Sequence, residues 1–245
     1  MAKRDFGPET AESVLTAWAY LSEAVGHIPA VNLGSYYVGP DFLGPCHPLV
    51  PSENDEIPEV FHAVLFYLQE GDETFSKAQT EQRTSLVMKS LPADTRTIGV
   101  EPDDGGDGWD IVLAEYVSAA DLARTGWREM KEALELADTR QDQRNLTEEL
   151  ALTELVYRTF LTCANTVEFL LARTRYERDG EARALATMRE IATRELTNAR
   201  DALHIYATAP WLDLAERQDG YFPHCADMIK AKVKWLRDFL EKTKA

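Results

Sequence analysis

The feature that most constrains the fold is a long apolar seam in the second half of the chain. Between residues 113 and 137, apolar or small residues recur at alternating spacings of three and four through three heptads. They are Leu113, Tyr116, Ala120, Ala123, Trp127, Met130, Leu134 and Ala137. This spacing places them on one face of an α-helix, and such a face must pack against other helices. The same pattern predicts a helix from Asn145 to a break at Gly180, with Leu152 among its inward-facing residues, and another from that break to about Ala209. A last helix is predicted after Pro223, with Ile229, Val233, Leu236 and Leu240 facing inward, and the whole region therefore predicts an antiparallel helical bundle.

The first hundred residues read differently. Apolar spacing predicts a helix over residues 11–25, and Pro58 suits the first turn of another. Residues 29–58 between them form a long loop rich in proline and glycine, and loops of this length are more often functional than not. Residues 85–88 and 97–100 allow one small strand pair. We expect a mostly α fold with regions 1–102 and 103–245, divided at an acidic glycine-rich loop, folding as one compact unit.

The charge balance limits the partners of the chain. With 245 residues it is long enough to bury a sizeable core, and 26 Lys and Arg against 42 Asp and Glu leave a net charge of −16. An acidic surface repels phosphates, so we expect neither nucleic acid nor a membrane as a partner. No apolar stretch is long enough for a signal peptide or a membrane span, and three widely separated cysteines fit a reducing compartment. These features predict a cytoplasmic location.

The sequence lacks the strong catalytic and cofactor motifs. There is no Walker loop, no GxGxxG after a strand, no HExxH, no GxSxG and no paired CxxC, and the five histidines lack metal-ligand spacing. The acidic loop at residues 103–110 invites a calcium reading but departs from the EF-hand pattern at Gly105 and Ala114, which favours a solvated loop. We therefore expect no metal and no cofactor, and whether the chain is an enzyme stays open.

Two sets of polar residues on the predicted helices can be either structural or functional. Paired carboxylates can serve glycosidic chemistry, yet Glu148 and Glu149 lie opposite an apolar seam and fit a solvent face better, as do Glu129, Glu132 and Glu135. In contrast, Asn165, Glu168 and Arg173 lie among apolar neighbours, where an amide and a guanidinium need partners. They predict either a structural hydrogen-bond network, which we favour, or ligand contacts.

The loop at residues 34–48 stands out chemically. Tyr36, Tyr37 and Phe42 offer flat faces for the apolar side of a pyranose ring, while Asp41 and His47 can hydrogen-bond its hydroxyls. Two Gly-Pro pairs stiffen the loop, which lowers the entropic cost of binding. A loop that only packs its aromatic side chains over the end of the bundle explains the same composition.

Several short motifs carry a resemblance to a known group of enzymes. In the first region they are Ala17-Trp-Ala-Tyr-Leu-Ser-Glu-Ala-Val, Tyr36-Tyr-Val-Gly-Pro and Gly44-Pro-Cys-His-Pro. In the second region they are Leu155-Val-Tyr-Arg-Thr-Phe, Asn165-Thr-Val-Glu-Phe, Glu195-Leu-Thr-Asn-Ala-Arg, Gln218-Asp-Gly-Tyr and Ile229-Lys-Ala-Lys-Val-Lys-Trp-Leu. Together they resemble the C-terminal helical region behind the catalytic barrel of some bacterial glycoside hydrolases of the hexosaminidase-like and α-glucuronidase-like kind.

The chain departs from that group in one important respect. Such enzymes carry their catalytic carboxylates on a (β/α)₈ barrel of about 250 residues, and the alternating pattern of a barrel is missing here. The resemblance therefore implies an accessory domain that completes a barrel-containing chain or domain. It implies that Tyr37, Asp41 and His47 reach a sugar site, together with Asp219 and Tyr221 from a later loop.

We thus expect a helical accessory domain or subunit of a carbohydrate-active enzyme, with a carbohydrate ligand and a barrel-containing partner. In this hypothesis, Asn165 and Arg173 orient the aromatic loop. The alternative is a non-catalytic, acidic helical module for protein interaction or self-association. A third hypothesis is a bundle enzyme that acts on a small metabolite through His47 or His224, since histidine is the natural base near neutral pH.

Overall fold

The computed structural model describes residues 2–28, 43–52, 58–61, 108–213 and 224–244. Within these ranges it contains α-helices and short 3-10 turns and no strand. The α-helices are α1 (Ala2–Phe6), α2 (Ala11–Gly26), α8 (Gly108–Glu135), α9 (Arg140–Asp179), α10 (Ala182–Thr208) and α11 (Cys225–Lys242). The 3-10 turns are η1 (Gly44–Cys46), η2 (Glu59–Phe61) and η4 (Pro210–Leu212). The mostly α, helical-bundle fold predicted from the sequence is therefore confirmed.

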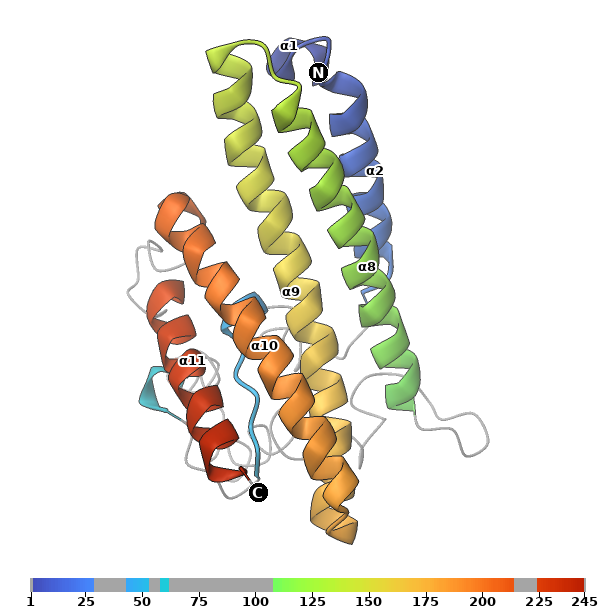
Figure 1. Cartoon of the computed structure of the whole chain (residues 1–245). Helices are drawn as coiled ribbons and strands as arrows, with labels where there is room; N and C mark the ends of the chain where they lie inside the picture. The colour runs from blue at the N-terminus through green and yellow to red at the C-terminus, as the bar shows by residue number, and fades with distance from the viewer. Residues whose placement is uncertain (1, 29–42, 53–57, 62–107, 214–223, 245) are drawn as a thin grey trace, which may run out of the picture.

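The 40-residue helix α9 connects the two halves of the bundle. Helices α2 and α8 pack along one side of it, while α10 and α11 pack beside its C-terminal half (Figure 1). On the first side, Phe160, Cys163 and Val167 of α9 join a core with α8, and on the other side Phe169 and Ala172 join a core with α10 and α11. One helix therefore buries two of its faces, which is why its apolar residues are not confined to a single stripe.

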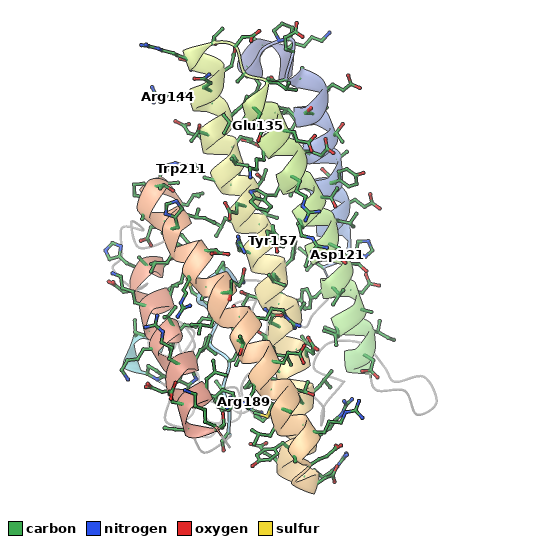
Figure 2. All side chains as sticks on the ribbon, viewed as in Figure 1. Asp121, Glu135, Arg144, Tyr157, Arg189 and Trp211 are labelled. Carbon is green, nitrogen blue, oxygen red and sulfur yellow. The ribbon has the colours of Figure 1, made fainter. Side chains whose placement is uncertain are left out.

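The contacts between α2, α8 and α9 are close. Gly126 of α8 lies so near α2 that a Cβ atom added there would come within 2.9 Å of the Ala17 carbonyl oxygen. Farther along, Tyr157 of α9, labelled in Figure 2, stacks on Trp127 of α8 at a ring-centroid distance of 5.7 Å. The Arg158 guanidinium lies over both rings. The seam predicted over residues 113–137 is thus a packed interface, with a glycine where two backbones approach.

The two ends of α9 differ in how well the apolar pattern predicts them. Gly180 ends the helix in the left-handed conformation with φ 63°, as predicted. The start at Arg140 lies five residues before the predicted Asn145, because the Thr139 side chain accepts a hydrogen bond from the Asp142 backbone N–H at 3.0 Å and caps the helix. Leu152, predicted to face inward, is 39% exposed.

The remaining helix predictions also have clear outcomes. Helix α2 lies within a residue of its predicted bounds, α10 ends one residue before the predicted end, and α11 follows Pro223 as predicted. The candidate strands at residues 85–88 and 97–100 lie outside the described residues, as does most of the helix predicted after Pro58. In the part of the chain that the structure describes, every helix is too short or too polar to cross a membrane.

Candidate functional site

A buried ion pair lies at the junction of α9, α10 and α11. Lys232 of α11 donates through Nζ to Oε1 of Glu195 on α10 at 2.5 Å, and both side chains are 0% exposed. Each charged group occupies a position on the packed face of its helix, where the sequence pattern calls for an apolar residue. Removing two charges from water costs several kcal/mol per ion, so this arrangement is stable only when both groups are fully hydrogen-bonded.

Polar side chains of α9 and α10 provide those hydrogen bonds. The Thr162 hydroxyl donates to Glu195 Oε1 at 2.7 Å, and the Asn165 amide donates to Glu195 Oε2. The Asn198 amide donates to the Thr162 hydroxyl oxygen at 2.9 Å. We call Thr162, Asn165, Glu195, Asn198 and Lys232 the Glu195 network. Its single carboxylate and single ammonium balance, so the network is electrically neutral.

Arginines extend this network to the surface of the bundle. Arg194 donates to the Asn165 side-chain oxygen at 2.7 Å and also pairs with Glu168. Arg158 lies 3.0 Å from the Asp201 carboxylate and 2.9 Å from that of Glu154. Because the amide of Asn165 is used at both its nitrogen and its oxygen, it acts as a structural bridge.

The network also holds residues 43–52, which begin within the aromatic loop at residues 34–48. Lys232 Nζ donates a second hydrogen bond to the Pro45 carbonyl oxygen at 2.8 Å. Trp235 of the same helix donates to the Leu49 carbonyl at 2.7 Å, and Arg173 of α9 donates to the Val50 carbonyl at 3.0 Å. Three side chains from two helices therefore satisfy main-chain carbonyls that would otherwise be buried without partners. We call residues 43–52 the anchored segment.

His47 lies within the anchored segment and is 2% exposed. Burial, followed by the nearby charge of Lys232, lowers its pKa to about 3, while the Pro48 carbonyl acts in the opposite direction. The imidazole is therefore neutral at pH 7, and neither ring nitrogen makes a hydrogen bond of normal geometry. His47 is therefore a neutral, buried side chain in this structure.

The two cysteines nearest to this region are also buried. The Cys46 thiol donates to the Cys225 carbonyl oxygen at 3.7 Å. Hydrogen bonding to Cys225 and burial raise the pKa of Cys46 well above its usual value. Since the thiolate is the reactive form, these contacts make Cys46 a packing residue and not a nucleophile.

The chemistry open to the described residues follows from these placements. Among the described residues, Glu195 is the one fully buried carboxylate, but its oxygens already accept hydrogen bonds and it has no access to solvent. The exposed carboxylates Glu132, Glu135 and Glu148 lie on helix surfaces, and Glu149 accepts a hydrogen bond from Trp18 at 2.7 Å. Among the described residues, no group of three His, Cys, Asp or Glu side chains could hold a metal ion.

Of the seven sugar-site residues predicted from the sequence, the structure describes His47. The other six lie outside the described residues: Tyr36, Tyr37, Asp41, Phe42, Asp219 and Tyr221. The structural hydrogen-bond network favoured for Asn165, Glu168 and Arg173 is present, since each makes the contacts given above. His224, the second candidate base, is largely exposed and lies 3.3 Å from the Asp213 carboxylate.

Sequence reasoning missed Glu195 and Lys232, the centre of the network. A signal was available, because Lys232 falls between Ile229 and Leu236 on the apolar face of its helix, and Glu195 falls on the seam that contains Ala192 and Ala199. A charged residue at such a position needs a buried partner of opposite charge. Two such residues on different predicted helices indicate a pair.

In comparisons with protein-family models, with curated proteins and with solved structures, nothing matches the chain.

Proposed function

We propose that the chain is a helical accessory domain or subunit of a carbohydrate-active enzyme that contributes its aromatic loop to a glycan site. In this proposal Tyr36, Tyr37 and Phe42 offer stacking surfaces to a sugar ring. Asp41 hydrogen-bonds its hydroxyls, and the acid/base carboxylates come from a barrel-containing partner. The resemblance to the helical regions of glycoside hydrolases is the starting point of this proposal.

The observation that carries the proposal is the anchored segment. Residues 43–52 include the end of the aromatic loop at residues 34–48, and buried donors from α9 and α11 hold the carbonyls of Pro45, Leu49 and Val50. A binding loop whose end is fixed by a rigid scaffold loses less conformational entropy when a ligand binds. In this proposal, the stable packing of α9, α10 and α11 holds one end of the aromatic loop in place for ligand binding.

The motifs of the resemblance support the same proposal from another direction. Asn165 and Phe169 come from one motif, Glu195 and Asn198 from a second, and Lys232 from a third. Four of these five residues belong to the Glu195 network, and Phe169 packs in the adjoining core. Residues that are scattered along the sequence thus act together to hold the Gly44-Pro-Cys-His-Pro motif.

Isothermal titration calorimetry with a panel of mono- and oligosaccharides tests the proposal. We expect heat of binding for at least one sugar, and weaker binding by Arg173→Met, which removes the donor to the Val50 carbonyl. Arg128→Met, an exposed arginine on α8, is the matched control and should bind like the wild-type chain. If no sugar gives heat with the chain, either alone or mixed with a barrel-containing chain encoded beside it, the proposal is wrong.

A further inference from the structure

Two surface grooves of opposite charge lie outside the site described above. The first, of about 510 Å³, runs between α10 and α11. Its floor is apolar, with Leu203 and Val233, and its rim carries Arg200, Lys230, Lys234, Arg237 and Asp238. Four cations against one carboxylate make this groove basic on a chain whose net charge is −16.

The cations of this groove are not equally available. Lys230 and Lys234 pair with Asp227 and Asp238 at 2.9 and 2.7 Å, in exposed pairs along one helix that are individually weak. Arg200 and Arg237 face the same groove from different helices, and neither makes an ion pair within the described ranges. A guanidinium can bind a carboxylate through two parallel hydrogen bonds. Arg200 and Arg237 are therefore the groups in this groove that bind a carboxylate most strongly.

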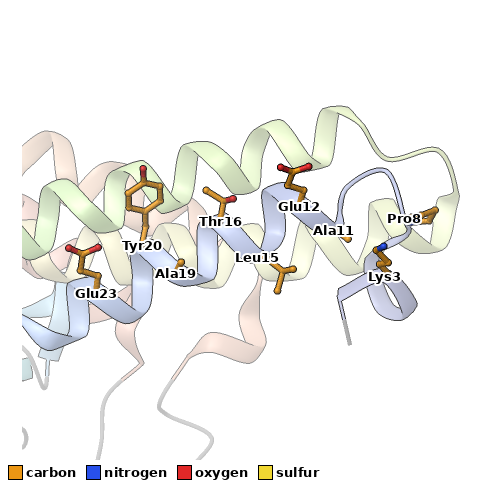
Figure 3. Close-up of a pocket in the computed structure, with 9 residues that line it drawn as sticks. All are labelled: Lys3, Pro8, Ala11, Glu12, Leu15, Thr16, Ala19, Tyr20 and Glu23. Atoms are coloured by element: carbon orange, nitrogen blue, oxygen red, sulfur yellow. The ribbon is translucent and has the colours of Figure 1, made fainter.

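The second groove follows the outward face of α2 and has a volume of about 720 Å³ (Figure 3). Its centre is apolar: Leu15 is 56% exposed, and Ala19 and Tyr20 also line this part of the surface. Glu12 and Glu23 stand near its two ends, eleven residues or about 16 Å apart along the helix. Among the described residues that line it, Lys3 is the one cation.

We propose that two copies of the chain associate by docking the α2 face of one copy into the α10–α11 groove of the other. The apolar centre around Leu15 then covers Leu203 and Val233, and the carboxylates of Glu12 and Glu23 meet the basic rim. This is the helix-in-groove mode of recognition, in which apolar residues at helical spacing supply affinity and flanking charges set the register. The proposal is independent of sugar binding.

The geometry sets the type of assembly. Helices α2 and α11 lie on opposite sides of the bundle, so the two surfaces cannot meet within one molecule (Figure 1). The contact is heterologous, and it therefore adds copies head to tail instead of closing as a two-fold dimer. A single helix face in one groove falls at the small end of protein interfaces, below about 1,200 Å², which predicts weak, concentration-dependent association.

The net charge of −16 gives the association an unusual salt dependence. At about 0.01 M salt the Debye length is about 30 Å, so the whole-molecule repulsion between two acidic copies dominates. At about 0.15 M it falls to about 8 Å, which screens that repulsion more than the close contacts in the groove. At about 1 M the close contacts are screened as well. Association should therefore be strongest at intermediate salt.

Sedimentation velocity over a concentration series at these three salt levels is the test. Glu12→Lys combined with Glu23→Lys should weaken association at least about tenfold, and Lys230→Glu combined with Arg237→Glu should do the same. Carrying all four changes in one chain should restore it, as should mixing the two double variants. Circular dichroism checks that each variant is folded, which is expected because all four side chains are exposed.

The matched control is Glu132→Lys with Glu135→Lys on α8, which makes the same change of net charge, from −16 to −12, on another surface. It should leave association as strong as in the wild-type chain or stronger. A wild-type chain that is monomeric at every concentration and salt level overturns the proposal and leaves the groove to an acidic helix of another protein. Failure of the four-residue swap to restore association overturns it too.

Discussion

Replacing Lys232 by methionine should destabilise the fold strongly. Methionine keeps the length and apolar stem of the side chain but removes the ammonium that lies 2.5 Å from Glu195 Oε1 and 2.8 Å from the Pro45 carbonyl. Glu195 is then a fully buried carboxylate without a counter-charge. Breaking one partner of such a pair costs about 3–5 kcal/mol, a large share of the about 5–15 kcal/mol that stabilises a typical domain.

Two further variants separate the lost charge from the lost packing. Combining Lys232→Met with Glu195→Gln removes both charges, so the double variant should be about 2 kcal/mol more stable than Lys232→Met alone. Lys234→Met is the control, because Lys234 is 79% exposed and its pair with Asp238 contributes at most about 1 kcal/mol. Lys232 and its control Lys234 lie on the same helix, α11.

Urea-induced unfolding followed by circular dichroism measures these differences. The midpoint should shift while the denaturant slope stays constant, which indicates a change in stability without a change in the surface exposed on unfolding. The reasoning is refuted if Lys232→Met lies within about 1 kcal/mol of the wild-type chain, or if the double variant is less stable than the single one.

Three further predictions follow from the packing. His47 is protonated near pH 6.5 in the unfolded chain, whereas in the folded chain its pKa is lowered to about 3. The free energy of unfolding should therefore fall by about 2 kcal/mol from pH 8 to pH 5, as measured by urea unfolding. In His47→Leu this dependence of stability on pH should be weaker. Gly126→Ala should cost about 1–3 kcal/mol by thermal unfolding, because the new Cβ meets the Ala17 carbonyl, whereas Gly26→Ala, with nothing within 4 Å, should be neutral. Cys46 should react with a thiol reagent in urea but not in native buffer, and fast native reaction would contradict its burial.

The helices could be predicted from the sequence because each buries one face against its neighbours. That requirement imposes a period of about 3.6 residues, and α8, α10 and α11 show it plainly. Helix α9 was harder, since it packs on two sides and its start depends on the cap at Thr139. The inward prediction for Leu152 failed for the same reason, because a helix with two buried faces has no single stripe to follow.

The candidate site was predictable only in part. Asn165 and Arg173 could be recognised as polar residues among apolar neighbours, and both are hydrogen-bonded inside the bundle. Their partners could not be named, because sequence spacing does not say which helices pack together. The burial of His47 could not be predicted from the sequence either. The segment that contains His47 is held by Lys232, which lies 185 residues farther along the chain.

Amide hydrogen exchange across the anchored segment tests most directly whether the Glu195 network holds the end of the aromatic loop. In the wild-type chain the His47 amide, which donates to the Gly44 carbonyl at 3.1 Å, should exchange slowly. Lys232→Met should speed its exchange at least about tenfold more than it speeds the exchange of the α2 amides at the far end of the bundle. Lys234→Met should leave the His47 exchange rate unchanged. Equal exchange in the wild-type chain and in Lys232→Met, or an increase no greater than that of α2, would contradict this role of the network.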